Sequence, residues 1–186
     1  RLWGGAPVHV ARIGEALEKM GAYPEALEVY AESDEVHPGH PIIATRRAVV
    51  LLRMGEATMA EESLLTAVEN AARPLGVIQF SEPFLRRAAR LDIRETITNR
   101  ALEKYPNQLE LMQKSLESAL GIGELEAAGV RAARLIRIHP SSLAWVVNVY
   151  AEHGLDGVAH RLVKAEELER VRDTATVEQR REALAT

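Results

Sequence analysis

Residues 41–74 read PIIATRRAVVLLRMGEATMAEESLLTAVENAARP, and this stretch decides the fold. Gly55 divides it into two segments, 41–54 and 57–72, whose apolar residues follow the spacing of one helix face. A glycine at this place ends the first helix, because it adopts the left-handed backbone that a helix terminus favours. The stretch is therefore predicted to form two antiparallel helices joined by a short turn.

The same residue types recur every 34 positions along the chain. A period of this size is typical of a repeat array, in which each helix pair buries its apolar face against its neighbours. The alanines of the pattern are expected to be buried where two helices cross closely, since larger side chains would push the helices apart. The pattern has three series. The glycine series is Gly21, Gly55, Gly123 and Gly157, with Ala89 at the position where a glycine is missing. The other two series are Ala26, Ala60 and Ala128, and Pro38, Pro106 and Pro140.

The period predicts an all-α protein, a solenoid of about five antiparallel helix pairs in a single domain over residues 1–186. Apolar side chains make up 47% of the chain and aromatic ones only 4%, which favours helices over strands. A short polar helix over 176–185 is expected to cap the array. The predicted units are 7–40, 41–74, 75–108, 109–142 and 143–174, with turns at Gly21, Gly55, about Leu91, Gly123 and 153–157.

The third unit departs from this plan because it contains two prolines. Pro74 and Pro83 predict a loop or a broken helix over 73–81 and a short helix over 82–91, with Ser81 as its N-cap. Asp92 and Asn107, each followed three residues later by glutamate, predict the starts of the next two helices.

The chain resembles the tetratricopeptide repeat family over roughly residues 6–174. The resemblance implies a right-handed superhelix whose first helices line a concave groove for extended peptides or partner helices, and it implies no chemistry. The family has a small alanine in the second helix of each unit. Two units of this chain have a larger residue at that position, Arg94 in the third and Leu162 in the fifth. The Lys and Asn of the family's carboxylate clamp are replaced by Ala11 and Glu15 in the first unit. The residues that carry the resemblance in the first unit are Val10, Ile13, Gly14, Leu17, Gly21, Tyr23, Ala26, Tyr30 and Pro38.

The composition argues against most chemical functions. The chain has no cysteine, and neither a nucleophile motif nor a phosphate-binding loop is present, so we expect no enzymatic activity and no cofactor. His37 and His40 flank a turn, which we interpret as a loop rather than a metal site. A formal net charge of −4 argues against nucleic-acid binding, and the apolar runs are too short for membrane insertion.

A set of basic and amide side chains forms the candidate binding site. Arg46 and Arg53 are seven positions apart and share a helix face, and the repeat period carries this face into the later units. The stacked repeats would align these residues into a basic stripe suited to carboxylates. The alternative is that they are ordinary surface charges paired with Glu15, Glu18, Glu110 and Glu117. The candidate groove residues are Arg46, Arg53, Arg86, Arg87, Lys114 and Asn148.

We therefore predict a non-enzymatic scaffold that binds a protein or peptide, with an acidic segment as one option. The alternative is a docking region of a larger bacterial enzyme or assembly, such as a glycan synthesis or export machine.

The bacterial source is inferred from nineteen arginines against four lysines. The chain begins without methionine, which predicts a fragment of a longer protein. A third option is self-assembly through exposed repeat faces, if residues 1–6 begin a truncated unit whose apolar face is uncovered. The compartment stays open, with the cytoplasm slightly favoured over the periplasm.

Overall fold

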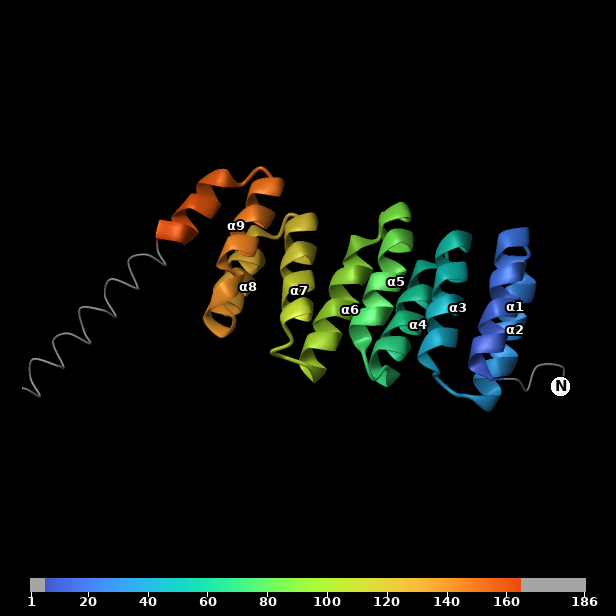
Figure 1. Cartoon of the computed structure of the whole chain (residues 1–186). Coiled ribbons are helices and arrows are strands. Elements are labelled where there is room, and N and C mark those ends of the chain that lie inside the picture. Colours follow the sequence, from blue (N-terminus) through green and yellow to red (C-terminus); the bar gives the residue numbers. More distant parts are fainter. Residues whose placement is uncertain (1–5, 165–186) are drawn as a thin grey trace, which may run out of the picture. The chain divides into compact units, whose positions relative to one another are not determined.

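The computed structural model describes residues 6–164 of the 186-residue chain, and these residues form helices joined by short turns (Figure 1). The helical segment that begins at residue 156 is described as far as residue 164. The predicted capping helix over 176–185 lies outside the described residues. The helices are α1 (Pro7–Met20), α2 (Tyr23–Val36), α3 (Pro41–Met54), α4 (Ala57–Asn70), α5 (Pro74–Arg87), α6 (Leu91–Lys104), α7 (Leu109–Gly121), α8 (Leu125–Ile138) and α9 (Leu143–Glu152), with a 3-10 turn at Pro140–Ser142.

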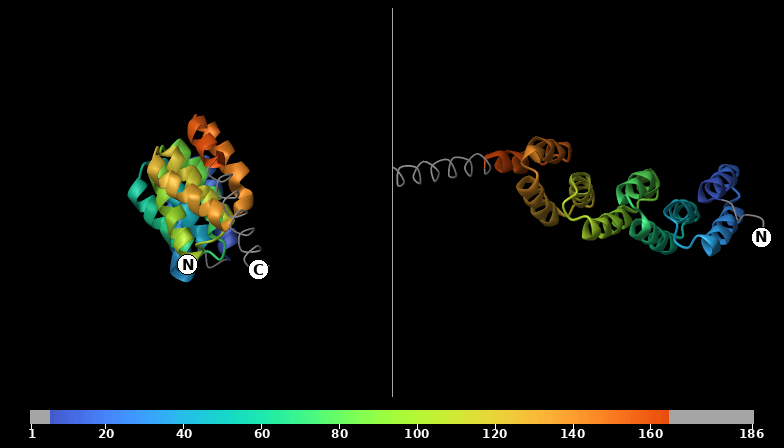
Figure 2. Two further views of the ribbon diagram at one scale, coloured as in Figure 1. Left: turned by 90° about the vertical axis from the view of Figure 1, so that its left-hand side faces the viewer. Right: turned by 60° about the horizontal axis from the view of Figure 1, so that its bottom comes forward.

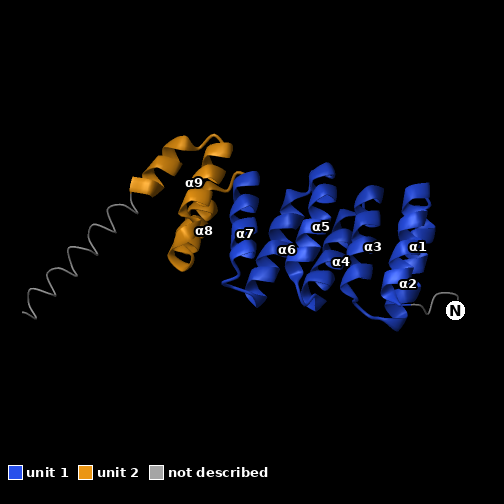
Figure 3. Ribbon diagram, viewed as in Figure 1, with its two compact units in different colours: residues 1–122 blue, residues 123–186 orange. Residues whose placement is uncertain are grey.

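The chain divides into two compact units, residues 1–122 and residues 123–186, and each is described by itself (Figure 3). In the first unit α1, α3, α5 and α7 form one layer, and α2, α4 and α6 form the other (Figure 2, right). Contacts run between successive helices and also from α1 to α3, from α3 to α5 and from α4 to α6. This is the packing of a solenoid, as the sequence predicts. A single domain over the whole chain stays a prediction.

Most residues of the repeat pattern hold the positions that the sequence predicts, but Gly157 lies inside the helical segment that begins at residue 156, and Gly154 has the left-handed backbone instead. Gly21 and Gly55 end α1 and α3 with left-handed backbones, at φ of 76° and 85°. Ala26, Ala60 and Ala128 are each 0% exposed, which confirms their predicted burial at helix crossings. The turn between α7 and α8 contains Gly123, at φ of 81°. Local backbone freedom and close packing thus act together at each repeat.

The prediction for the third unit is wrong, because α5 is one continuous helix from Pro74 to Arg87. Pro74 occupies the first turn, where no amide partner is lost. Pro83 lies inside the helix and removes one backbone hydrogen bond. The buried face of α5, with Ile78 and Leu85 at 0% exposure, packs tightly enough to keep the helix continuous.

The predicted N-caps also differ from the structure. Ser81 lies inside α5, where its buried hydroxyl donates a hydrogen bond to the carbonyl oxygen of Ile78. Asp92 belongs to the first turn of α6, which begins at Leu91, and α7 begins two positions after Asn107. The turn before α6 therefore occupies 88–90, slightly earlier than predicted. Packing of the apolar faces sets these helix starts, and the cap motifs do not.

Ala89 holds a left-handed backbone, at φ of 53°, where the pattern elsewhere has glycine. An L-residue with a side chain suffers a steric penalty in this conformation that glycine avoids. We expect Ala89→Gly to raise the free energy of unfolding by about 1 kcal/mol. Urea denaturation of both proteins measures the change. A less stable variant would show that the turn of the third unit does not require this conformation.

In the second unit, the 3-10 turn precedes α9, and a turn at 153–155 separates α9 from the helical segment that begins at residue 156. The predicted turn at 153–157 therefore extends too far along the chain. Val146 and Tyr150 of α9 are buried, together with Ala132 and Leu135 of α8. The second unit thus repeats the helix-pair plan of the first.

Candidate functional site

Five of the six predicted groove residues belong to the first unit. Arg46 and Arg53 lie on α3, Arg86 and Arg87 lie on α5, and Lys114 lies on α7. All three helices belong to the same layer (Figure 2). The sixth residue, Asn148, is exposed on α9 in the second unit and is described apart from the others.

Glutamates of α1 neutralise Arg46 and Arg53 of α3. The Nη2 atom of Arg46 donates a hydrogen bond of 2.8 Å to Oε2 of Glu15. The carboxylate of Glu18 lies 4.0 Å from Arg46 and 3.7 Å from Arg53. The pKa of Glu15 is lowered, first by the hydrogen bond from Lys19 and then by the charge of Arg46. These contacts join α1 to α3 along the surface of the layer.

The guanidinium groups of α3 also stack on aromatic rings. Arg46 lies over the ring of Phe80 at 4.8 Å from its centroid, and Arg53 lies over Phe84 at 5.5 Å and over Tyr23 at 5.9 Å. The rings of Phe80 and Phe84 are 5.8 Å apart. Cation–π contacts at these distances are attractive. The arginines therefore act as links to the aromatic rings of α2 and α5, with their charge already engaged.

Beneath this surface, Glu18 is buried and accepts a hydrogen bond of 2.7 Å from the hydroxyl of Tyr30. Burial raises the pKa of Tyr30 above its ordinary value, and the hydrogen bond to Glu18 raises it further. The Tyr30 ring passes Gly14 so closely that a Cβ atom on Gly14 would overlap it. Gly14 therefore makes room for the contact that satisfies the buried carboxylate.

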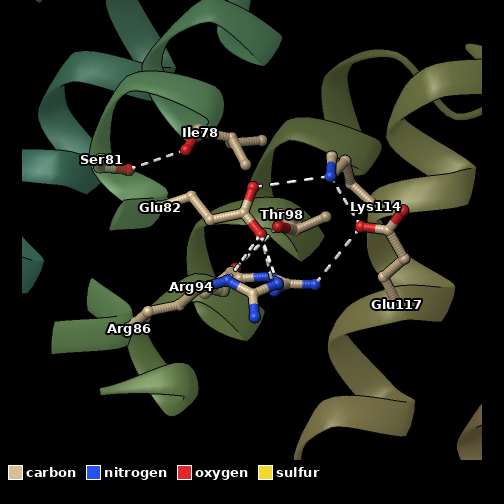
Figure 4. Close-up of polar contacts among 8 residues, drawn as sticks. All are labelled: Ile78, Ser81, Glu82, Arg86, Arg94, Thr98, Lys114 and Glu117. Carbon is tan, nitrogen blue, oxygen red and sulfur yellow. Dashed lines mark hydrogen bonds and ion pairs between the residues drawn. The ribbon is translucent and has the colours of Figure 1, made fainter. Parts of the chain in front are cut away.

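A second group of charges joins α5, α6 and α7 (Figure 4). Glu82 on α5 accepts hydrogen bonds of 2.9 Å from both Arg86 and Arg94, and its other oxygen lies 3.5 Å from Nζ of Lys114. Glu117 on α7 lies 2.7 Å from Lys114 and 3.7 Å from Arg94. We call these five residues the Glu82 cluster.

Arg94 is the buried centre of the Glu82 cluster, with only 2% of the residue exposed. Burial alone would raise the pKa of Glu82, but the hydrogen bond from Arg86 and the charges of Arg94 and Lys114 lower it below its ordinary value. The carboxylate is therefore kept ionised. Arg94 occupies the position that holds a small alanine in the first, second and fourth units. At this helix crossing an ion pair between Arg94 and Glu82 therefore takes the place of an apolar contact.

These pairs change the interpretation of the basic stripe. A glutamate lies within 4.0 Å of each of Arg46, Arg53, Arg86 and Lys114, so these four residues are paired charges rather than an open basic stripe. Their partners include Glu15, Glu18 and Glu117, as the alternative interpretation holds. Arg87 is exposed and makes no ion pair with any residue between 6 and 164. The sequence thus indicated three of the glutamate partners, and the structure adds Glu82, which the sequence did not indicate.

The structure adds a feature that the sequence reasoning missed, an open hollow of about 450 Å³ between the beginnings of α3 and α5. Ile42 and Phe80 line it and remain 42% and 39% exposed, and Val77 and Pro41 add further apolar surface. The guanidinium of Arg46 closes one side against Phe80. The remaining lining residues are His40, Thr45, Ala71, Ala72, Arg73 and Gly76.

The described residues contain no group of three or more side chains that could hold a metal ion. His40, which the sequence analysis weighed as a ligand, precedes the first residue of α3 and lines the hollow. Between residues 6 and 164 no helix has the length and apolar character needed to cross a membrane.

Paired helices that repeat at a fixed period, with glycine turns and buried alanines, make the first unit an all-α helical-repeat solenoid similar to tetratricopeptide repeat proteins. No protein-family model and no curated protein matches the sequence. Solved structures with similar folds include MamA from Desulfovibrio magneticus RS-1, at 14% identity, with 91% of this chain and 98% of that chain covered and a TM-score of 0.45.

Two further solved structures superpose to a similar extent. YrrB, described as a TPR protein with an unusual peptide-binding site, is 14% identical, with 83% and 81% of the two chains covered and a TM-score of 0.45. A tetratricopeptide repeat protein from Parabacteroides merdae ATCC 43184 is 15% identical, with 84% and 62% covered and a TM-score of 0.45. Likenesses of this size assign no partner or activity to the present chain.

Proposed function

We propose that this chain is a non-enzymatic protein-binding module whose first unit holds a segment of a partner protein against the layer of α1, α3 and α5. The observation that carries the proposal is the hollow between α3 and α5, where Ile42 and Phe80 expose apolar surface to solvent. Binding energy at protein interfaces concentrates where a bulky apolar side chain fills such a depression. The hollow is therefore the anchor point of the surface.

The charges around the hollow favour binding of the partner through apolar contacts rather than through charge attraction. Arg46 and Arg53 already contact Glu15 and Glu18, so an acidic partner would have to compete with carboxylates that are held in place. A carboxylate of the partner that replaces one of these contacts would therefore add little net binding energy. The alternative function, a docking region of a larger bacterial enzyme or assembly, stays a prediction.

Selection of random dodecapeptides displayed on phage against the 186-residue chain tests the proposal. We expect the selected peptides to share a bulky apolar residue and to lose at least tenfold in affinity for Phe80→Ala, measured by fluorescence anisotropy. A tenfold loss equals about 1.4 kcal/mol, as expected for removal of an anchoring contact. Circular dichroism of the variant checks that its helices persist.

The matched control is Val130→Ala, which removes an exposed apolar side chain from α8 in the second unit. Its affinity for the selected peptides should equal that of the unmodified protein. The proposal is wrong if Phe80→Ala binds the selected peptides as tightly as the unmodified protein. It is also wrong if Val130→Ala weakens binding as much as Phe80→Ala does.

A further inference from the structure

The hollow exists because glycine interrupts a series of branched apolar residues. Near the starts of three helices, the positions that lie one repeat period apart hold Val8 in α1, Ile42 in α3 and Gly76 in α5. A Cβ atom added to Gly76 would meet no atom within 4 Å. The space that a side chain would occupy in the third unit is therefore open and forms part of the hollow.

The charges that line the hollow are of one sign. The charged side chains among its lining residues are those of Arg46 and Arg73, and no aspartate or glutamate lines it. Arg46 is engaged by Glu15 at 2.8 Å. Arg73 is exposed and makes no ion pair with any described residue. Arg73 is therefore the lining cation that is left to meet a negative group from outside.

The hollow is large enough to admit a bulky side chain together with the backbone beside it. Its volume of about 450 Å³ lies within the range of roughly 300–1,000 Å³ that is typical of ligand sites. Its floor consists of aliphatic and aromatic groups from Ile42, Val77 and Phe80. Such a floor binds an apolar side chain by removing its surface from water.

We propose that the hollow takes a bulky apolar side chain of a partner protein segment, and that an aspartate or glutamate beside that side chain pairs with Arg73. This inference rests on the proposed function and adds the chemistry of the partner. The apolar side chain supplies most of the affinity, because it fills the hollow. The carboxylate supplies selectivity, because Arg73 attracts a negative group and repels a positive one.

Defined peptides test this chemistry. The first peptide is Gly-Ser-Gly-Asp-Phe-Asp-Gly-Ser-Gly, the second carries lysine in place of both aspartates, and the third carries alanine in place of phenylalanine. Each is titrated into the isotope-labelled 186-residue chain while the NMR signals of the Gly76 and Phe80 amides are followed. We expect the aspartate peptide to bind at least tenfold more tightly than the lysine peptide, and the alanine peptide to cause no shift.

Two variants connect the preference to named residues. Gly76→Leu places a side chain in the hollow, and its Cβ atom would meet nothing within 4 Å, so it should abolish binding of the first peptide while the thermal midpoint stays equal or rises. Arg73→Glu should reverse the preference, so that the lysine peptide binds more tightly. Arg87→Glu is the matched control, since it makes the same change of charge at an exposed arginine at the other end of α5 and should leave the preference intact.

The results separate this inference from the proposed function. Equal binding of the aspartate and lysine peptides, to the unmodified protein and to Arg73→Glu, would overturn the inference. The proposed function would still hold if selected peptides required Phe80. Binding of the first peptide to Gly76→Leu at full affinity would likewise overturn the inference, because the hollow would then not be the site. Failure of every selected peptide to depend on Phe80 would instead overturn the proposed function.

Discussion

Replacing Arg94 with alanine is expected to lower the free energy of unfolding by roughly 3–5 kcal/mol, the largest effect of any single substitution considered for this protein. Arg94 is 2% exposed and its Nη1 atom lies 2.9 Å from Glu82, a carboxylate with a side chain only 15% exposed. Removing the arginine leaves this carboxylate buried with fewer partners and opens a cavity between α5, α6 and α7. Urea denaturation followed by circular dichroism measures the loss.

A matched control on the same helix shows whether the loss of stability comes from the burial of the arginine or from the number of its ion pairs. Arg100 contacts Glu69 and Glu103, each at 2.7 Å, but its side chain is 49% exposed. Water screens these pairs, so Arg100→Ala should have a much smaller effect than Arg94→Ala. An equal loss from the two substitutions would show that burial does not set the strength of the Glu82 cluster.

A double substitution tests whether the loss comes from the unpaired carboxylate. We expect Arg94→Met with Glu82→Leu to recover much of the stability that Arg94→Met alone loses, because neither buried charge then remains. Arg86 is largely exposed, and Lys114 keeps Glu117 at 2.7 Å, so both can lose Glu82 at little cost. No recovery in the double variant would indicate that packing, rather than charge, accounts for the loss.

Replacing Gly14 with alanine is expected to lower the free energy of unfolding by roughly 2–4 kcal/mol. The new Cβ atom would overlap the ring and hydroxyl of Tyr30, which is 0% exposed and has no room to move away. Displacing the ring would also weaken its hydrogen bond to the buried Glu18. The expected sign is informative, because helix propensity alone would favour alanine by about 1 kcal/mol. Thermal and urea denaturation both report the change.

Gly129 provides the control for this substitution. It lies within α8, and a Cβ atom there would meet nothing within 4 Å. Gly129→Ala should therefore raise the free energy of unfolding by about 0.5–1 kcal/mol through helix propensity alone. A stabilised Gly14→Ala protein would contradict the close packing of Tyr30 against α1.

The helix boundaries show how far local sequence can be interpreted. Gly21 and Gly55 end their helices as predicted, because the left-handed backbone at a helix terminus is a local preference. The same reasoning predicted a broken helix at Pro83, and this was wrong. The free energy lost with one backbone hydrogen bond at Pro83 is smaller than the free energy gained by burying the face of α5 that contains Ile78 and Leu85. A local rule therefore holds at a turn and can fail inside a packed helix.

The candidate site shows a similar division. The repeat period places Arg46, Arg53 and Lys114 in one layer, and it marks Arg94 as a departure from the small alanine. Glu15 was one of the partners that the alternative interpretation offered, and it pairs with Arg46, whereas nothing in the sequence indicated that Glu82 turns toward Arg94. The hollow had a sequence signal in Gly76, where the two preceding units have branched side chains, but its lining also needs Phe80 from a turn further along α5.

The sequence by itself determined the repeat, the helix pairing, the glycine turns and the buried alanines, because each depends on residues close in the chain or on a strict period. The tertiary structure decided the continuity of α5, the glutamate partners of the arginines and the hollow between α3 and α5. These features depend on side chains from different helices, and small rotations or shifts between helices change which of them meet. Periodicity specifies the face on which a residue lies, whereas packing specifies the atom that it contacts.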